Sequence, residues 1–446
     1  MSDIHVSAQN IYNGLLKFLT CGSVDDGKST LIGRLLYESN LVYDDQIEAL
    51  KKDSLKKGMK EDEGLDFSLL LDGLKAEREQ SITIDVAYRY FATNKRKFII
   101  ADCPGHVQYT RNMVTGATHA DAAIILIDAS KGMKSQTRRH AYIISLLGIK
   151  HVILAVNKMD LIGYNEDKFK AITDEFIHFS KHLGFDDLKI IPLCAIADSA
   201  GDGGNLVTKS DKMPFYDGPT LLETLENMDV GNRFNLNDFR FNVLYVNRPN
   251  CDFRGYSGAI ASGIVHVGDE VVVLPSGLKT KIKGIVTANG DLSVATVPQT
   301  VCLTLQDELD VSAGDMIVAA KRIPQCANQF YAYLIWMDTQ NLNLGKKYVM
   351  RIGAREVKAF VKEITYVLDV DTMTIDAGKP VESNSIAKVV VETVSDIYFD
   401  SFTSNPALGR FILIDTLTNA TVAGGMILQT AQEPFQKENV FHQFWK

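Results

Sequence analysis

Residues 22–29 read Gly-Ser-Val-Asp-Asp-Gly-Lys-Ser and match the phosphate-loop pattern GxxxxGK[ST]. The loop follows an apolar run over residues 15–21, which is typical of a buried strand. Its two glycines allow the backbone to curl its N–H groups around phosphates at the positive end of the next helix. Lys28 is expected to reach the β- and γ-phosphates, and Ser29 to hold Mg²⁺. This stretch therefore predicts an α/β sheet that binds a nucleoside triphosphate.

A second motif, Asp-Cys-Pro-Gly-His at residues 102–106, follows another apolar run at 97–101. Asp102 is expected to hold Mg²⁺ through water. Gly105 lacks a Cβ, so its backbone can approach the γ-phosphate closely and report its presence. Phosphoryl transfer depends more on positioning than on a strong base, so His106 is expected to orient the attacking water. The alternative is that His106 is an ordinary surface histidine.

A third motif, Asn-Lys-Met-Asp at residues 157–160, follows the apolar residues 152–156. The Asp160 carboxylate can accept hydrogen bonds from both N1–H and the exocyclic amine of guanine, a donor pair that adenine lacks. The tetrapeptide alone is also consistent with a charged turn. Its position behind a phosphate loop predicts guanine recognition.

Thr83, in the run Ile-Thr-Ile at residues 82–84, lies between the phosphate loop and the second motif. It is placed to bind Mg²⁺ and to sense the γ-phosphate. A threonine between isoleucines is otherwise an ordinary strand residue.

Together these motifs resemble the translational GTPase superfamily, of which elongation factor Tu is typical, over nearly the whole chain. Four longer strings resemble one branch, the large GTPase subunit of heteromeric sulfate adenylyltransferase: residues 21–36, 71–80, 88–91 and 136–140. Elongation factors usually carry histidine where Asp26 stands.

The expected fold is an α/β P-loop GTPase domain with a doubly wound, mostly parallel sheet, followed by two β-barrel domains. Apolar runs alternate with helical patterns such as 137–147, 169–183 and 220–228 up to about residue 229. From about residue 239 the pattern changes to period two, as in residues 279–285, where lysines share one face. The aromatic residues of the unit that opens near residue 329 are expected to pack in the core or between domains; the alternative is a platform that stacks on bases. We expect domains at 1–230, 238–327 and 328–432, and a tail at 433–446.

The predicted site comprises three overlapping sets. The nucleotide-binding residues are Gly22, Ser23, Val24, Asp25, Asp26, Gly27, Lys28, Ser29, Thr30, Asp102, Cys103, Pro104, Gly105, Asn157, Lys158, Asp160, Cys194, Ala195 and Ile196. The catalytic residues are His106, Lys28 and Thr83, and the Mg²⁺ ligands are Ser29, Thr83 and Asp102. The resemblance further implies that Asp25 helps to hold a monovalent cation, and that Val24 and Ile82 form a hydrophobic gate beside His106.

Two residues depart from the family pattern. Ser81 stands where the family usually has glycine, and Cys194-Ala195-Ile196 replaces the guanine-binding Ser-Ala-Leu. The Ala195 N–H is still expected to meet the guanine oxygen, because a backbone contact needs no side chain. A thiol is a weaker donor than a hydroxyl, so we expect nucleotide affinity to change by less than roughly 1 kcal/mol.

Composition narrows the remaining classes of function. The 446 residues allow about three domains. The formal charge of −8 argues against a general nucleic-acid coat but does not exclude a local RNA site; we expect no nucleic-acid partner. The six cysteines include no C-x-x-C pair, which fits a reducing cytoplasm. No apolar stretch approaches the roughly 20 residues of a membrane span, so we expect no membrane partner.

By resemblance, the chain would hydrolyse GTP to drive a small catalytic subunit that makes adenosine 5′-phosphosulfate and pyrophosphate from ATP and sulfate, the first step of sulfate assimilation. Some relatives continue into an adenylylsulfate kinase domain, which is not expected here. The main alternative is an elongation-factor-type GTPase that delivers aminoacyl-tRNA. A third is a regulatory GTPase that reports its nucleotide state to another protein.

Overall fold

The computed structural model describes residues 14–39, 45, 47–48, 50–52, 67–70, 77, 83–196, 204–230, 234–250 and 253–431. The chain separates into two compact units. One is formed mainly by Met1–Gly231, and the other mainly by Asn232–Asp369 and Met373–Lys437. The predicted tail at 433–446, Ser81 and Ile82 lie outside the described residues.

The first unit is built on a six-stranded sheet in the order β2-β3-β1-β4-β5-β6. Its strands are β1 (Leu15–Gly22), β2 (Ala87–Ala92), β3 (Lys97–Asp102), β4 (Ala122–Asp128), β5 (His151–Asn157) and β6 (Asp187–Pro192). Only β2 runs antiparallel to its neighbour. Every residue of β4 is buried, as expected of a strand covered on both faces.

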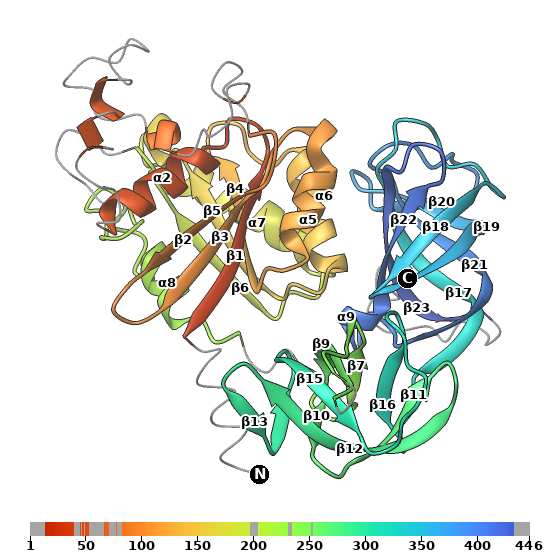
Figure 1. Cartoon of the computed structure of the whole chain (residues 1–446). Helices are drawn as coiled ribbons and strands as arrows, with labels where there is room; N and C mark the ends of the chain where they lie inside the picture. The colour runs from red at the N-terminus through yellow and green to blue at the C-terminus, as the bar shows by residue number, and fades with distance from the viewer. Residues whose placement is uncertain are drawn as a thin grey trace. The chain divides into compact units, whose positions relative to one another are not determined.

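Helices cover both faces of this sheet (Figure 1). They are α2 (Lys28–Glu38), α5 (Thr110–Ala117), α6 (Ser135–Leu146), α7 (Glu166–Ser180) and α8 (Leu221–Asn227). Leucines of α2 and α8 share one core cluster with β1 and β4, so these two helices pack on the same face. The turns η1 (Phe67–Leu70), η2 (Val107–Tyr109) and η3 (Met159–Ile162) are 3₁₀ helices.

Helix α7 begins three residues before the predicted start at 169. The side chain of Asn165 caps the helix by accepting a hydrogen bond from the Lys168 N–H at 2.9 Å. Glu166 and Asp167 follow in the first turn, where carboxylates favour the positive end of the helix. This capping signal is polar, so an apolar pattern does not reveal it.

The second unit begins with a barrel closed by six strands in the ring β11-β16-β7-β9-β15-β12. The strands of this barrel and its margins are β7 (Arg240–Asn242), β8 (Tyr245–Asn247), β9 (Gly255–Ser262), β10 (Ile264–His266), β11 (Glu270–Leu274), β12 (Leu278–Thr287), β13 (Gly290–Leu292), β14 (Val294–Thr296), β15 (Thr300–Leu305) and β16 (Met316–Ala319). Along β12, the lysines at 279, 281 and 283 are exposed while Thr280 and Ile282 are buried, which confirms the predicted alternation.

A further ring, β18-β22-β23-β17-β21-β19, closes the other barrel of this unit. Its strands are β17 (Gln325–Trp336), β18 (Lys347–Ile352), β19 (Arg355–Asp369), β20 (Thr374–Asp376), β21 (Ile386–Phe399), β22 (Arg410–Asp415) and β23 (Thr421–Thr430). Phe330, Trp336 and Tyr348 are almost fully buried in its core, so the prediction that these aromatic residues pack inside is confirmed. The predicted fold class, a P-loop α/β domain followed by two β-barrels, is confirmed as well.

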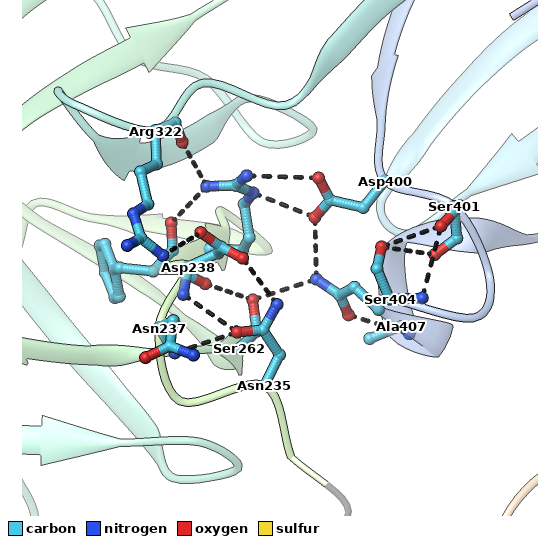
Figure 2. A network of polar contacts seen from close by, with 12 residues as sticks. Asn235, Asn237, Asp238, Ser262, Arg322, Asp400, Ser401, Ser404 and Ala407 are labelled. Atoms are coloured by element: carbon cyan, nitrogen blue, oxygen red, sulfur yellow. Dashed lines mark hydrogen bonds and ion pairs between the residues drawn. The ribbon is translucent and has the colours of Figure 1, made fainter. Parts of the chain in front are cut away.

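A polar network joins the two barrels (Figure 2). Arg240 of β7 forms a bidentate ion pair with Asp400, at 3.1 and 3.2 Å. Asn405, which caps α9 (Pro406–Gly409), donates to both Ser262 and Asp400 at 3.0 Å. The planar guanidinium matches the carboxylate, so this pairing fixes orientation as well as distance.

None of the helices in the described part of the chain is long and apolar enough to cross a membrane.

Candidate nucleotide-binding site

The four sequence motifs meet at the carboxyl ends of parallel strands, where open α/β sheets bind ligands. The phosphate loop leaves β1, Asp102 ends β3, and Asn157 ends β5. Thr83 reaches the same place, because its Oγ1 lies 3.5 Å from Ser29 Oγ. The structure therefore brings together residues that are far apart in the sequence.

The phosphate loop requires both of its glycines. Gly27 caps α2 with a φ of 93°, and a Cβ there would overlap the side-chain amide of Asn157. Gly22 has a φ of 149°, and a Cβ there would lie 2.6 Å from the carbonyl oxygen of Leu126. Both positions combine an unusual backbone with no room for a side chain.

Lys28, the first residue of α2, lies inside the loop. Its Nζ donates to the carbonyl oxygens of Ser23 at 2.8 Å and Gly22 at 3.4 Å. Burial lowers the pKa of Lys28, while the nearby carboxylate of Asp102 opposes this effect. The ammonium is thus held at the loop by carbonyl groups that an incoming phosphate can replace.

Ser29, Thr83 and Asp102 offer the oxygen ligands that Mg²⁺ prefers. The two hydroxyl oxygens, at 3.5 Å, are close enough for two positions on one octahedral ion. Thr20 donates to Asp102 Oδ1 at 3.2 Å and orients the carboxylate. Burial raises the pKa of Asp102 to about 6, opposed by Lys28. This donor set fits Mg²⁺.

In the second motif, Gly105 is packed directly against the phosphate loop. A Cβ on Gly105 would overlap Lys28 Nζ and would lie 2.8 Å from the Gly22 carbonyl oxygen. His106 follows and caps η2, where its Nδ1 accepts a hydrogen bond from the Gln108 N–H at 3.3 Å. This bond leaves Nε2 as the nitrogen available to a water molecule.

Asn157 links the phosphate loop to the segment after β6. Its Nδ2 donates to the carbonyl oxygen of Asp26 at 2.9 Å, and its Oδ1 accepts from the Ala195 N–H at 3.1 Å. The sequence predicts that this N–H meets the guanine oxygen. In the structure it is already paired, because a buried N–H needs an acceptor. A contact with guanine would therefore share the N–H with Asn157.

Asp160 and Cys194 are in direct contact. The Cys194 thiol donates to Asp160 Oδ1 at 3.3 Å and also lies 3.1 Å from the Ile196 carbonyl oxygen. Burial raises the pKa of Cys194 to about 11, and the Asp160 carboxylate acts in the same direction. The thiol therefore stays protonated near neutral pH and remains a donor.

The other predicted residues surround this centre. Thr30 lies on α2, Cys103 and Pro104 are buried after β3, and Ile196 is 51% exposed. Asp25 is exposed, with a φ of 66°, and Val24 is partly buried. Ile82, the second half of the predicted gate, is not among the described residues.

Sequence reasoning missed two buried residues that support the site. Asp128, at the end of β4, forms an ion pair with Lys158 at 3.0 Å and so fixes the lysine of the third motif. His140 of α6 accepts a hydrogen bond from the Gly22 N–H through Nδ1 at 3.2 Å. Gln136 and His140 stand four residues apart, a spacing that puts both side chains on the same face of a helix. This spacing is the sequence signal for the face of α6 on which both are buried.

Comparison with known proteins agrees with this geometry. Residues 13–229 match the elongation factor Tu GTP binding domain family, and residues 329–428 match the GTP-eEF1A C-terminal domain-like family. Sulfate adenylyltransferase subunit 1 of Alteromonas mediterranea is 51% identical over 414 residues, covering 93% of this chain and 87% of that protein. The subunit 1 of Bacteroides thetaiotaomicron is 51% identical over 427 residues, covering 94% and 87%.

Among solved structures, the GTPase-like domain of Saccharomyces cerevisiae Ski7, bound to GTP, matches with a TM-score of 0.51. It is 18% identical and covers 94% of this chain and 98% of that one. A likeness at this level supports the fold alone.

Proposed function

The chain belongs to the sulfate adenylyltransferase subunit 1 family, and from this premise we propose how its GTP-binding site is used. The subunit hydrolyses GTP and thereby drives a small catalytic subunit, which makes adenosine 5′-phosphosulfate and pyrophosphate from ATP and sulfate in the first step of sulfate assimilation. The relatives are named as one subunit of an enzyme, which implies a partner chain.

GTP binding and hydrolysis are supported by the convergence of the four motifs on one sheet edge. Lys28 binds the β- and γ-phosphates after leaving the Ser23 carbonyl oxygen. Asp160 accepts the two guanine donors, with Cys194 holding the carboxylate in place. Ser29, Thr83 and Asp102 would hold Mg²⁺, which would neutralise charge on the phosphates.

Hydrolysis then needs a positioned water molecule. We assign this role to His106, whose Nδ1 is occupied by Gln108, so that Nε2 remains for the water. Gly105 lies against Lys28 and senses the γ-phosphate through its backbone. Asp25, exposed beside the loop, is assigned to a monovalent cation on the strength of the family pattern alone.

Coupling follows from the energetics of the partner's reaction. Joining sulfate to a nucleoside phosphate is unfavourable, whereas GTP hydrolysis is favourable. A switch whose two nucleotide states prefer different partner conformations can link the two reactions. The sequence contains a single phosphate loop, at residues 22–29, so we propose that ATP and sulfate react on the partner subunit.

We place the protein in the cytoplasm. The five cysteines within the described ranges are free thiols, as in a reducing compartment.

The proposal is tested by phosphate release from GTP. The chain is mixed with the small subunit from its own source, with ATP and sulfate added separately and together. We expect faster GTP hydrolysis only when the partner, ATP and sulfate are all present. GTP hydrolysis that responds to aminoacyl-tRNA instead would favour the elongation-factor alternative.

A further inference from the structure

Asp26 places a carboxylate inside the loop that must hold phosphates. Its side chain is 2% exposed, and its Oδ2 accepts a hydrogen bond from the Ser23 N–H at 2.6 Å. This bond closes the loop, because it ties the start of the loop to a position just before Lys28. A buried negative charge here also opposes the binding of an anionic ligand, since like charges repel strongly where water is excluded.

Lys134 supplies the opposite charge. It directly precedes α6, and its Nζ lies 3.4 Å from Asp26 Oδ1. Burial raises the pKa of Asp26, and Lys134 and Lys28 counteract this shift. Lys134 is partly exposed, whereas the carboxylate that it faces is almost fully buried.

The two lysines cannot play the same role once a nucleotide is bound. Lys28 is the residue that we assign to the β- and γ-phosphates, so its charge is then shared with the ligand. Among the described residues that act electrostatically on Asp26, Lys134 is the cation that stays available.

We propose that Lys134 is a positioning residue of the phosphate loop. By neutralising Asp26, it keeps the Ser23 N–H bound in the closed loop and removes the repulsion between the carboxylate and the phosphates. The inference rests on nucleotide binding at this loop, as in the proposed function. It adds the β4–α6 connection, residues 129–134, to the elements that set nucleotide affinity.

The test measures the dissociation constants of fluorescent GDP and GTP analogues on the full chain in four proteins. These are the wild type, Lys134→Met, Asp26→Asn and the double variant. The asparagine side chain keeps an oxygen that can accept the Ser23 N–H but removes the charge. Lys134→Met should weaken binding of both nucleotides about tenfold, because it leaves a buried charge without its partner. When Asp26→Asn is already present, Lys134→Met should raise the dissociation constants of both nucleotides by less than about twofold.

Lys131→Met is the matched control. Lys131 lies in the same connection and its side chain is 46% exposed. Its ion-pair partner among the described residues is Asp128, at 3.8 Å, and Asp128 keeps its closer partner Lys158 at 3.0 Å. The affinity of this variant for both nucleotides should stay within about twofold of the wild type.

Two results would overturn the inference. One is an unchanged affinity in Lys134→Met. The other is an equal loss of affinity when Lys134→Met is added to Asp26→Asn, which would mean a structural role independent of charge. Failure of the wild type to bind either nucleotide would instead overturn the proposed function.

Discussion

The thiol of Cys194 donates a hydrogen bond to the carboxylate of Asp160 across 3.3 Å. Cys194 follows β6, whereas Asp160 lies in η3 after β5, so the bond joins two loops at the same end of the sheet. It holds the carboxylate that we assign to guanine recognition. The strength of this bond should therefore be visible in guanine-nucleotide affinity.

Cys194→Ser tests this bond directly. A hydroxyl is a stronger donor than a thiol, so GTP affinity should rise by up to about fivefold, which corresponds to less than about 1 kcal/mol. Cys194→Ala should lower the affinity, and Cys326→Ser, at an exposed position in the barrels, should leave it unchanged. Titration with a fluorescent GTP analogue gives all three values. Equal affinity in the serine and alanine variants would show that the bond is not used.

Asp160→Asn should change which base is bound. The asparagine NH₂ is a donor and would face the exocyclic amine of guanine, which is also a donor. Xanthine carries a carbonyl oxygen at that position, so the preference should move from GTP toward xanthosine triphosphate. Competition between the two nucleotides for the same site measures the shift. An unchanged preference for GTP would remove Asp160 from the base pocket.

His106→Ala separates catalysis from binding. The variant should bind GTP nearly as well as the wild type, while hydrolysis slows by roughly two orders of magnitude, the scale expected when a positioned catalytic group is removed. Single-turnover hydrolysis together with binding data distinguishes the two effects. If binding falls as much as the hydrolysis rate, His106 is a structural residue.

His140→Asn tests the buried histidine through pH. Burial lowers the pKa of His140 to about 3, from an ordinary value near 6.5. Below about pH 6.5 the unfolded chain gains a proton that the folded chain does not bind until about pH 3, so His140 lowers the free energy of unfolding as the pH falls between these values. An asparagine side chain can still accept from the Gly22 N–H but does not titrate.

The stability difference between the wild type and His140→Asn should therefore shift in favour of the variant by up to about 1.4 kcal/mol per pH unit in this window. Thermal unfolding of both proteins from pH 7.5 to pH 5 provides the measurement. Parallel curves would show that His140 is not buried in its neutral form.

The motifs allowed much of the site to be predicted, because each is a short contiguous string at the end of a strand. Asp102 and Asn157 each end a run whose apolar pattern already marks a strand, and the loop that carries Lys28 directly follows another such run. The buried face of β12 was predictable for a similar reason, since period two is a local property.

Partners that are distant in sequence could not be predicted in this way. The ion pair between Lys134 and Asp26 joins residues 108 positions apart. The pair between Arg240 and Asp400 spans 160 positions. Such contacts depend on how the strands are ordered and how the barrels close. Local patterns in a single sequence do not specify either of these. The occupied N–H of Ala195 likewise depends on where Asn157 lies.

We propose that GTP hydrolysis on this chain drives the partner's synthesis of adenosine 5′-phosphosulfate. The most direct test measures pyrophosphate release from ATP by the chain and its small subunit, with sulfate, in the presence of GTP, a non-hydrolysable GTP analogue or no guanine nucleotide. We expect release to increase only when GTP, sulfate and both chains are present, and to fall back with His106→Ala. Pyrophosphate release that is the same with and without GTP, while the chain still hydrolyses GTP, would contradict the claim.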